Sequence, residues 1–280
     1  MADVAQAFVP GHVTGFFTTE PDSDPTKAGS RGCGIALSDG VTVTVQPADA
    51  TSVALNGEEI SMGAVERVLD ALDVTAAVRG VTDLPLGSGF GVSGAMALGT
   101  ALGANTAFDR RLSRNELVTI AHGAEVQAGT GLGDVVAQAQ GGVTIRLEAG
   151  GPHTNVLDAI PARRRVEYHV IGGLATEEVL NGNTDTISMA GKKALSDVVE
   201  DPTLNRFMRA SREFARESSL LTTRVRDVIL DVNKIGGTAT MAMLGKTVIA
   251  LDTGLSDAGY DPQVSKVYPT GAALEPAQRQ

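Results

Sequence analysis

One glycine-rich stretch constrains the fold of this chain more than any other. Residues 85–99, PLGSGFGVSGAMALG, contain five glycines and two serines and run directly into small, helix-forming residues. With so little side-chain bulk, backbone N–H groups can approach an anion, and the following helix points its positive end at the same place. The hydroxyl of Ser93 could meet a phosphate oxygen or its Mg²⁺. The stretch therefore predicts a phosphate-binding loop mounted on a helix.

Three other interpretations of the stretch were weighed. A P-loop requires Lys and then Ser or Thr after its last glycine, whereas Ala95 and Met96 follow Gly94, which excludes it. The string Gly89 to Gly94 matches GxGxxG, and Asp109 lies about twenty residues on, so an NAD-binding oxidoreductase remains an alternative. A Rossmann loop follows its strand directly, however, and here Pro85 and several loop residues intervene. A structural turn is the third interpretation.

The bulk composition narrows the class of protein. The chain has 280 residues, 42% of them hydrophobic and 20% charged, which is typical of a globular protein of two domains sharing a cleft. A net charge of −10 argues against nucleic-acid binding, and the basic runs at 110–114 and 163–165 are expected to be solvated. One cysteine and four scattered histidines predict neither a disulfide nor a zinc site. The N-terminus lacks a signal-peptide pattern and no apolar segment reaches 18 residues, so a cytoplasmic location without membrane contact is expected.

Hydrophobic periodicity and turn residues predict the main elements. An opening strand is expected to stop at Pro10-Gly11, and a helix from Arg114 begins with a capping box of Ser113 and Glu116 and ends at Gly129. The other expected strands span 35–37, 41–45, 76–81, 143–147, 166–171 and 247–251, and the other expected helices follow the loop or span 63–72, 188–199, 203–218 and 220–232.

The glycine-rich loop resembles the ATP loop of the GHMP small-molecule kinases, whose form is Pro, three residues, then Gly-Leu-Gly-Ser-Ser-Ala. Pro85, Gly89, Phe90, Gly91, Ser93 and Ala95 fall on that form, whereas Val92 and Gly94 depart from it. Three further stretches, 10–17, 129–142 and 233–245, occupy the places of the other family signatures in the family's order. The stretches 9–17, 30–32 and 236–245 look like the archaeal pantoate kinase branch of the family.

The resemblance implies an α+β fold of two domains. The N-terminal sheet-and-helix domain (1–160) would hold the ATP loop, and a ferredoxin-like C-terminal domain (161–280) would close the cleft. The implied activity is Mg²⁺- and ATP-dependent phosphorylation of the primary hydroxyl of pantoate to 4-phosphopantoate, a coenzyme A precursor. Another small alcohol, such as homoserine or mevalonate, and a non-catalytic sensor remain alternatives. A homodimer is open, since the sequence is silent on oligomeric state.

The resemblance also implies roles for individual residues. Asp134, which follows three alternating glycines, maps to the catalytic Asp, although its position alone equally suits a helix N-cap. Ser93 and Glu125 would hold Mg²⁺. The ATP-binding residues would be Pro85, Gly87, Ser88, Gly89, Gly91, Val92, Ser93 and Gly94, and the substrate-binding residues His12, Ser30, Arg31 and Gly237.

Overall fold

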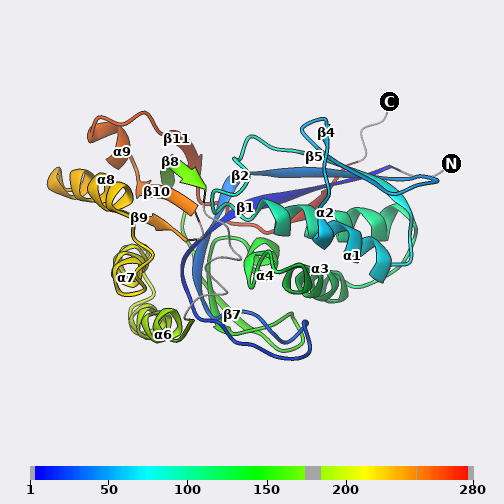
Figure 1. Ribbon diagram of the computed structural model, residues 1–280, viewed down its shortest axis with the longest axis horizontal. Coiled ribbons are helices and arrows are strands. Elements are labelled where there is room, and N and C mark those ends of the chain that lie inside the picture. The colour runs from blue at the N-terminus through cyan, green and yellow to red at the C-terminus, as the bar shows by residue number, and fades with distance from the viewer. Residues whose placement is uncertain (1–3, 174–183, 244, 277–280) are drawn as a thin grey trace.

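The computed structural model describes residues 4–173, 184–243 and 245–276, which form two sheets with helices packed against them (Figure 1). The larger sheet has the strand order β12-β1-β2-β5-β3-β4, and β6 and β7 extend it from β2. Its strands are β1 (Ala5–Phe17), β2 (Gly32–Pro47), β3 (Ser52–Leu55), β4 (Glu58–Glu59), β5 (Ala76–Val81), β6 (Val143–Glu148), β7 (Val156–Ile160) and β12 (Ala273–Glu275).

Strand β1 does not stop at Pro10-Gly11, so that part of the sequence prediction is wrong. The strand runs on to Phe17, paired with β2, and its register shifts between Pro10 and Gly11 and again between Thr14 and Phe16. Such irregularities let a strand carry a proline, which has no N–H for the ladder. The two short strands expected at 35–37 and 41–45 are likewise parts of the single strand β2.

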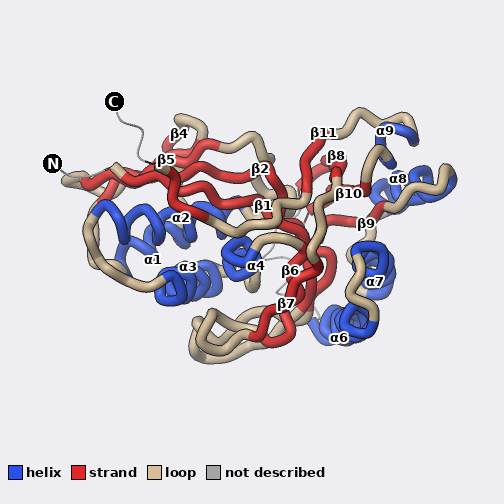
Figure 2. The backbone as a smooth tube through the Cα atoms, turned by 180° about the vertical axis from the view of Figure 1, so that it is seen from behind, coloured by secondary structure: helices blue, strands red, loops and turns tan. Residues whose placement is uncertain are grey.

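Helices α1 (Gly63–Ala71), α2 (Val92–Ala107), α3 (Arg114–Ala128) and α4 (Asp134–Gln140) gather on one side of the larger sheet (Figures 1 and 2). Helix α2 lies close to β2, because a Cβ built at Gly99 would be only 2.5 Å from Val43 Cγ2. The predicted capping box of α3 is confirmed, and Gly129 ends that helix in the left-handed region. The phosphate loop is thus carried by a helix packed directly on the sheet.

The smaller sheet has the order β11-β8-β10-β9, with every pair antiparallel. Numbered along the chain this is 4-1-3-2, the ferredoxin-like arrangement expected from the family resemblance. Its strands are β8 (Arg165–Gly173), β9 (Ala239–Ala242), β10 (Gly245–Leu251) and β11 (Gln263–Lys266), and its helices α6 (Thr184–Glu200), α7 (Leu204–Glu217), α8 (Thr223–Lys234) and α9 (Gly254–Asp257). Helix α8 begins later than predicted because Thr222 caps it.

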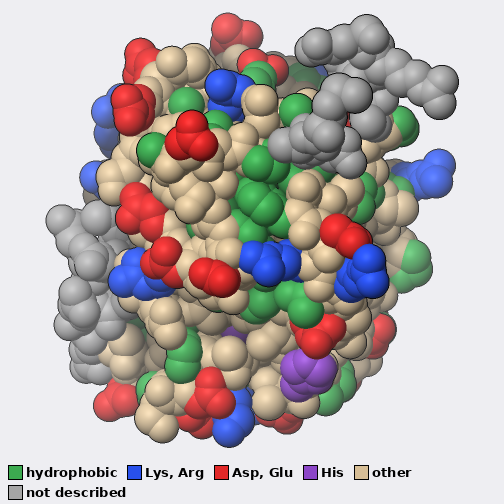
Figure 3. Space-filling view, turned by 90° about the vertical axis from the view of Figure 1, so that its right-hand side faces the viewer, with side chains coloured by type: hydrophobic (Ala, Val, Ile, Leu, Met, Phe, Trp, Pro, Cys, Tyr) green, Lys and Arg blue, Asp and Glu red, His purple; other side chains and the backbone are tan. Residues whose placement is uncertain are grey.

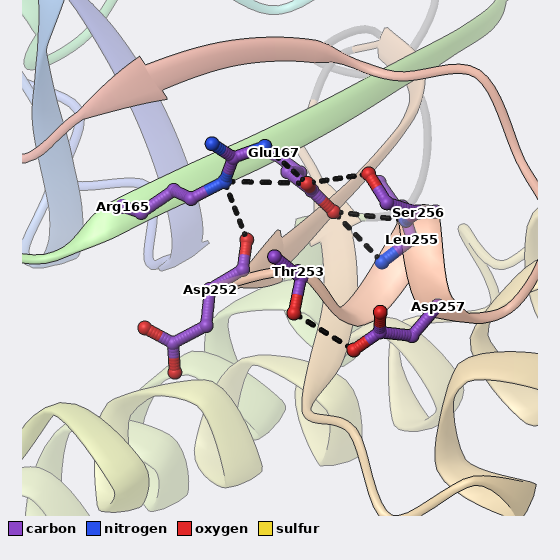
Figure 4. A network of polar contacts seen from close by, with 7 residues as sticks. All are labelled: Arg165, Glu167, Asp252, Thr253, Leu255, Ser256 and Asp257. Atoms are coloured by element: carbon purple, nitrogen blue, oxygen red, sulfur yellow. Dashed lines mark hydrogen bonds and ion pairs between the residues drawn. The ribbon is translucent and has the colours of Figure 1, made fainter.

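A buried carboxylate organises one end of the smaller sheet (Figure 4). Glu167 on β8 is fully buried, and its Oε2 accepts hydrogen bonds from the backbone N–H groups of Leu255 and Ser256, each at 3.0 Å. Its Oε1 accepts from Ser256 Oγ and Arg165 Nη2, both at 2.7 Å. These donors outweigh the effect of burial, which alone would raise the pKa of Glu167, and hold that pKa below its usual value. The carboxylate ties α9 to the sheet.

The chain crosses between the sheets in the segment from β7 to β8, and β12 later returns to pair with β1. A domain boundary near residue 160 stays a prediction.

On the face shown in Figure 3, acidic and basic side chains are interspersed around a band of hydrophobic ones. Within the described ranges, no helix combines the length and the apolar character needed to cross a membrane.

Candidate active site

The loop before α2 presents its backbone as an anion cradle. Gly87, Gly89 and Gly91 all have positive φ, between 64° and 86°, and Gly91 is the N-cap of α2. None of the backbone N–H groups of residues 87–94 donates a hydrogen bond to another described residue. Unpaired N–H groups at a helix N-terminus bind phosphate well. The loop has the geometry that the sequence predicted.

A buried carboxylate lies beside the first turn of α2. Glu125 on α3 is 2% exposed, and its Oε1 accepts hydrogen bonds from Ser93 Oγ at 2.5 Å and from Thr130 Oγ1 at 2.8 Å. Burial raises the pKa of Glu125 to about 7, against the lowering effect of these two hydroxyls. A buried carboxylate held only by neutral hydroxyls fits a cation, and the donors are oxygens, the ligands that Mg²⁺ prefers. Ser93 and Glu125 therefore suit the metal position expected of them.

Asp134 is the first residue of α4 and makes a short contact with β1. Its Oδ1 lies 2.6 Å from Nδ1 of His12, which is fully buried. The N-cap of α4 is Gly133, so the alternative interpretation of Asp134 as an N-cap is wrong. A Cβ built at Gly131 would lie 2.2 Å from Glu125 Oε2 and 3.3 Å from Asp134 Oδ2. Only a glycine at 131 lets the two carboxylates approach the same point.

The environment sets the charges of the His12–Asp134 pair. Burial lowers the pKa of His12, which outweighs the raising effect of Asp134, so the imidazole is neutral and donates from Nδ1. Burial would raise the pKa of Asp134, but the hydrogen bond from His12 and the charge of Arg146 outweigh that effect and lower it. Asp134 is therefore an ionised carboxylate with a fixed orientation.

Helix α4 brings this carboxylate against the phosphate loop. The side chain of Gln138, one turn after Asp134, donates from Nε2 to the carbonyl oxygen of Gly91 at 2.8 Å. Cβ atoms built at Gly91 and Gly94 would each lie 3.3 Å from Asp134 Cβ. The ATP loop and the catalytic candidate, some forty positions apart in the sequence, thus meet at one place.

Arg146 is a candidate functional residue that the sequence prediction missed. It lies on β6, opposite Gly32 of β2, and is 1% exposed. Its Nε and Nη2 reach Ser30 O and Oγ at only 3.3 Å, and its Nη1 has no partner among the described residues. It makes no ion pair within the described ranges. A buried guanidinium in this state is a receptor for an anionic group.

A small cavity joins Arg146 to Asp134. Its lining residues are Thr14, Phe17, Ser30, Leu132, Gly133, Asp134 and Arg146. Its volume of about 20 Å³ holds roughly one water molecule, so a substrate must move lining side chains to enter. Ser30, a predicted substrate-binding residue, lines this cavity together with Arg146, and its role stays a prediction.

Two predicted substrate residues are placed differently. Arg31 does not line this cavity; its backbone N–H bonds Thr18 Oγ1 at 3.2 Å and its Nε is buried without a partner among the described residues. Gly237 lies just after α8, where an added Cβ would be 2.7 Å from Val232 Cγ1. The missing side chain thus allows close packing against α8, and a role of Gly237 in substrate binding stays a prediction.

The part of the closing signature that reaches the phosphate loop lies further along the chain. Met243 N–H bonds the carbonyl oxygen of Thr14 at 2.8 Å, and Thr247 Oγ1 donates to Ser88 O at 3.0 Å. A Cβ built at Gly245 would lie 2.1 Å from that same Ser88 oxygen. The smaller sheet therefore touches the loop through the first residues of β10.

Comparisons with known proteins agree with this geometry. The family model "GHMP kinases N terminal domain" matches residues 59–142. The pantoate kinase of Thermococcus kodakarensis is 36% identical over 266 residues, covering 88% of this chain and 87% of that protein. The pantoate kinase of Methanocaldococcus jannaschii is 32% identical over 256 residues, covering 87% and 91%.

Solved structures agree as well. One described as a "Phosphotransferase related to CoA biosynthesis pathway" superposes with a TM-score of 0.89 and 30% identity, over 99% of this chain and 100% of that one. The homoserine kinase of Cytophaga hutchinsonii superposes with a TM-score of 0.72 but only 17% identity, over 98% of both chains, and so shares the fold. The α+β fold expected from the sequence is confirmed.

Proposed function

Because the chain belongs to the pantoate kinase family of the GHMP kinases, we propose that it transfers the γ-phosphoryl group of ATP to the primary hydroxyl of pantoate. The products would be 4-phosphopantoate and ADP. One observation carries the proposal: the ionised Asp134 lies between the phosphate loop and a cavity that a buried, unpaired Arg146 also lines. A substrate with a carboxylate at one end and a primary hydroxyl at the other matches the chemistry of these two groups, once the lining side chains have moved to admit it.

Arg146 is proposed to bind the carboxylate of pantoate. Its free Nη1 offers a charge-assisted hydrogen bond, and the paired anion would offset the cost of burying the guanidinium. Ser30 Oγ lies beside it; its hydroxyl donates to Leu132 O at 3.3 Å and would turn to donate to the same group. Pantoate carries two methyl groups on its central carbon, and Phe17 and Leu132 give the cavity apolar walls for them.

Asp134 is proposed to orient the attacking hydroxyl. Phosphoryl transfer needs positioning and charge neutralisation above all, and a carboxylate with a lowered pKa is a weak base. Asp134 therefore holds the hydroxyl in line by accepting its hydrogen bond and takes up the proton as the new O–P bond forms. The hydrogen bond from His12 fixes the carboxylate during this step.

The backbone of residues 87–94 is proposed to hold the ATP phosphates, with Ser93 and Glu125 at the Mg²⁺ position. The ion would neutralise charge on the phosphates and the leaving ADP. Thr130, which also bonds Glu125, keeps that carboxylate aimed at the site. Cytoplasmic location and a homodimer stay predictions.

The direct test is Asp134→Asn, assayed with MgATP and pantoate. We expect kcat to fall by about 10²–10⁴-fold, because the amide cannot accept the proton. Asp49→Asn, at an exposed position away from the site, is the matched control and should keep full activity. Turnover by Asp134→Asn at the control's rate would refute the role. A panel with homoserine and mevalonate tests the substrate: equal kcat/KM for either one would contradict pantoate as the substrate.

A further inference from the structure

A second hollow lies away from the active site, beside the segment that joins the two sheets. One arm has a volume of about 320 Å³ and the other about 460 Å³, and both are lined by Arg163 and Pro269, so the two hollows adjoin at these residues and together are called the linker groove. The first arm is lined by Ser38, Arg163, Arg164, Arg165, Lys266, Val267, Tyr268 and Pro269. These volumes fall in the range of small-molecule sites.

The first arm is basic, and only part of its charge is neutralised. Arg164 pairs with Asp252 through two bonds of 2.7 and 2.6 Å, and Arg165 pairs with Glu167. The side chains of Arg163 and Lys266 make no ion pair or hydrogen bond with any residue in the described ranges. No acidic residue lines this arm. In a chain of net charge −10, two free cations facing one hollow form a local anion-attracting site.

The second arm has a different chemistry. Beyond Arg163, its lining comes mainly from small and apolar residues: Gly141, Gly142, Ala159, Ile160, Pro161, Ala162 and Pro269, with Gln140. Such a surface favours the carbon skeleton of a ligand over a second charge. The groove is therefore charged at one end and apolar at the other.

We propose that the linker groove binds a small organic phosphate. The phosphate dianion lies between Arg163 and Lys266, and the organic part occupies the arm formed by residues 140–142 and 159–162. Two cations match the two charges of a phosphate monoester, and charge-assisted hydrogen bonds to Arg are among the strong ones in proteins.

The groove also contacts segments that lead to the active site. Gly141, in the apolar arm, is the C-cap of α4, whose first residue is Asp134. Gly142 N–H bonds Tyr268 O at 2.7 Å, and Tyr268 N–H bonds Ala36 O at 2.8 Å. A ligand here binds the folded state and spans the connection between the sheets, so it stabilises the protein against unfolding.

The chain contains no tryptophan, so Tyr268→Trp places a single fluorescent reporter in the groove. The probes are phenyl phosphate and inorganic phosphate, titrated without ATP and excited at the indole. Probe bound at the phosphate loop is distinguished from probe in the groove by the double variants described below, which leave that loop unchanged. We expect saturable changes with both probes, with phenyl phosphate binding more tightly because its ring enters the apolar arm.

Two double variants of the reporter protein test whether the phosphate binds between Arg163 and Lys266. Arg163→Ala with Lys266→Ala should weaken phenyl phosphate at least tenfold, whereas Lys192→Ala with Arg224→Ala, which removes the same charge at exposed positions outside the groove, should not. No saturable change, or equal weakening by both double variants, would overturn the proposal. If Tyr268→Trp fails to fold, the rise in melting temperature with phenyl phosphate is compared between the wild-type chain and Arg163→Ala/Lys266→Ala. An equal rise in both would overturn it as well.

Discussion

Replacing Arg146 by methionine should weaken the binding of pantoate without lowering the stability of the folded protein. The variant therefore distinguishes a residue that binds substrate from one that supports the fold. Without substrate the guanidinium is 1% exposed and makes only two long contacts, at 3.3 Å, with Ser30. Burying such a charge costs several kcal/mol, which these contacts and the attraction of Asp134 offset only in part. An apolar side chain of similar length avoids that cost.

The expected changes in melting temperature and in KM follow from the cost of burying the guanidinium. Replacing buried charges by apolar groups of similar volume is neutral or stabilising by about 1–4 kcal/mol, and the lost attraction of Asp134 places Arg146→Met near the lower end. At roughly 2–4 °C per kcal/mol, the melting temperature should stay level or rise by a few degrees. Loss of one partner of a buried carboxylate–guanidinium pair costs about 3–5 kcal/mol. The KM for pantoate should therefore rise by about 10²–10⁴-fold.

Arg31→Met is the matched control, since Arg31 was the guanidinium that the sequence favoured for the same role. Both variants are assayed for the KM of pantoate and of ATP, and both are melted without ligands. For Arg146→Met we expect a selective rise in the KM for pantoate, with the KM for ATP changed little. A KM for pantoate within threefold of wild type would contradict the proposed role of Arg146 in binding. A melting temperature lowered by more than about 5 °C would contradict it as well, since that outcome means that the guanidinium supports the fold.

Two further variants test other parts of the structure. Glu167→Gln should lower the free energy of unfolding at pH 7 by about 2–4 kcal/mol, because an amide cannot accept all the hydrogen bonds that the carboxylate accepts. The pKa of Glu167 is lower in the folded than in the unfolded state, so its contribution to the free energy of unfolding is complete above its unfolded pKa of about 4.3 and is lost as the pH falls through the folded pKa. In urea unfolding, the stabilities of the variant and wild type should therefore converge at low pH. A constant difference in the free energy of unfolding down to pH 2 would contradict this. Gly131→Ala should raise the Mg²⁺ concentration for half-maximal activity by about tenfold, because its Cβ would displace Glu125 Oε2, and an unchanged Mg²⁺ titration would count against Glu125 as a metal ligand.

Features encoded within a few residues could be predicted from the sequence. The capping box at Ser113 and Glu116 needs only four consecutive positions, and the glycines from Gly87 to Gly94 are sufficient to predict the loop that they form. The course of β1 could not be predicted in this way. Proline and glycine usually end a strand, and only pairing with β2 across shifted registers carries this strand past Pro10.

Arg146 shows a different limit of sequence reasoning. In VTIRLE, one arginine in an apolar strand suits an exposed position in a strand of alternating burial equally well. Its burial follows from β6 pairing with β2 on one side and β7 on the other, with α4 packed over it. An arginine between Ile145 and Leu147 was the available signal. The residue that shares its cavity, Asp134, lies twelve positions away on another element, so its role required the fold.

Contacts with two neighbouring elements hold α4, the helix of only seven residues that carries the candidate base Asp134. Asp134 and Gln138 are four residues apart, so both side chains lie on one face of α4, toward Gly91 and Gly94. One bonds His12 on β1 and the other bonds the carbonyl of the α2 N-cap, while Val135, Val136 and Ala137 are buried. A shift of α4 would therefore break its bonds to both neighbours together. The distance from the carboxylate to the phosphate loop is fixed before any substrate binds, which is the condition under which positioning lowers the barrier to phosphoryl transfer.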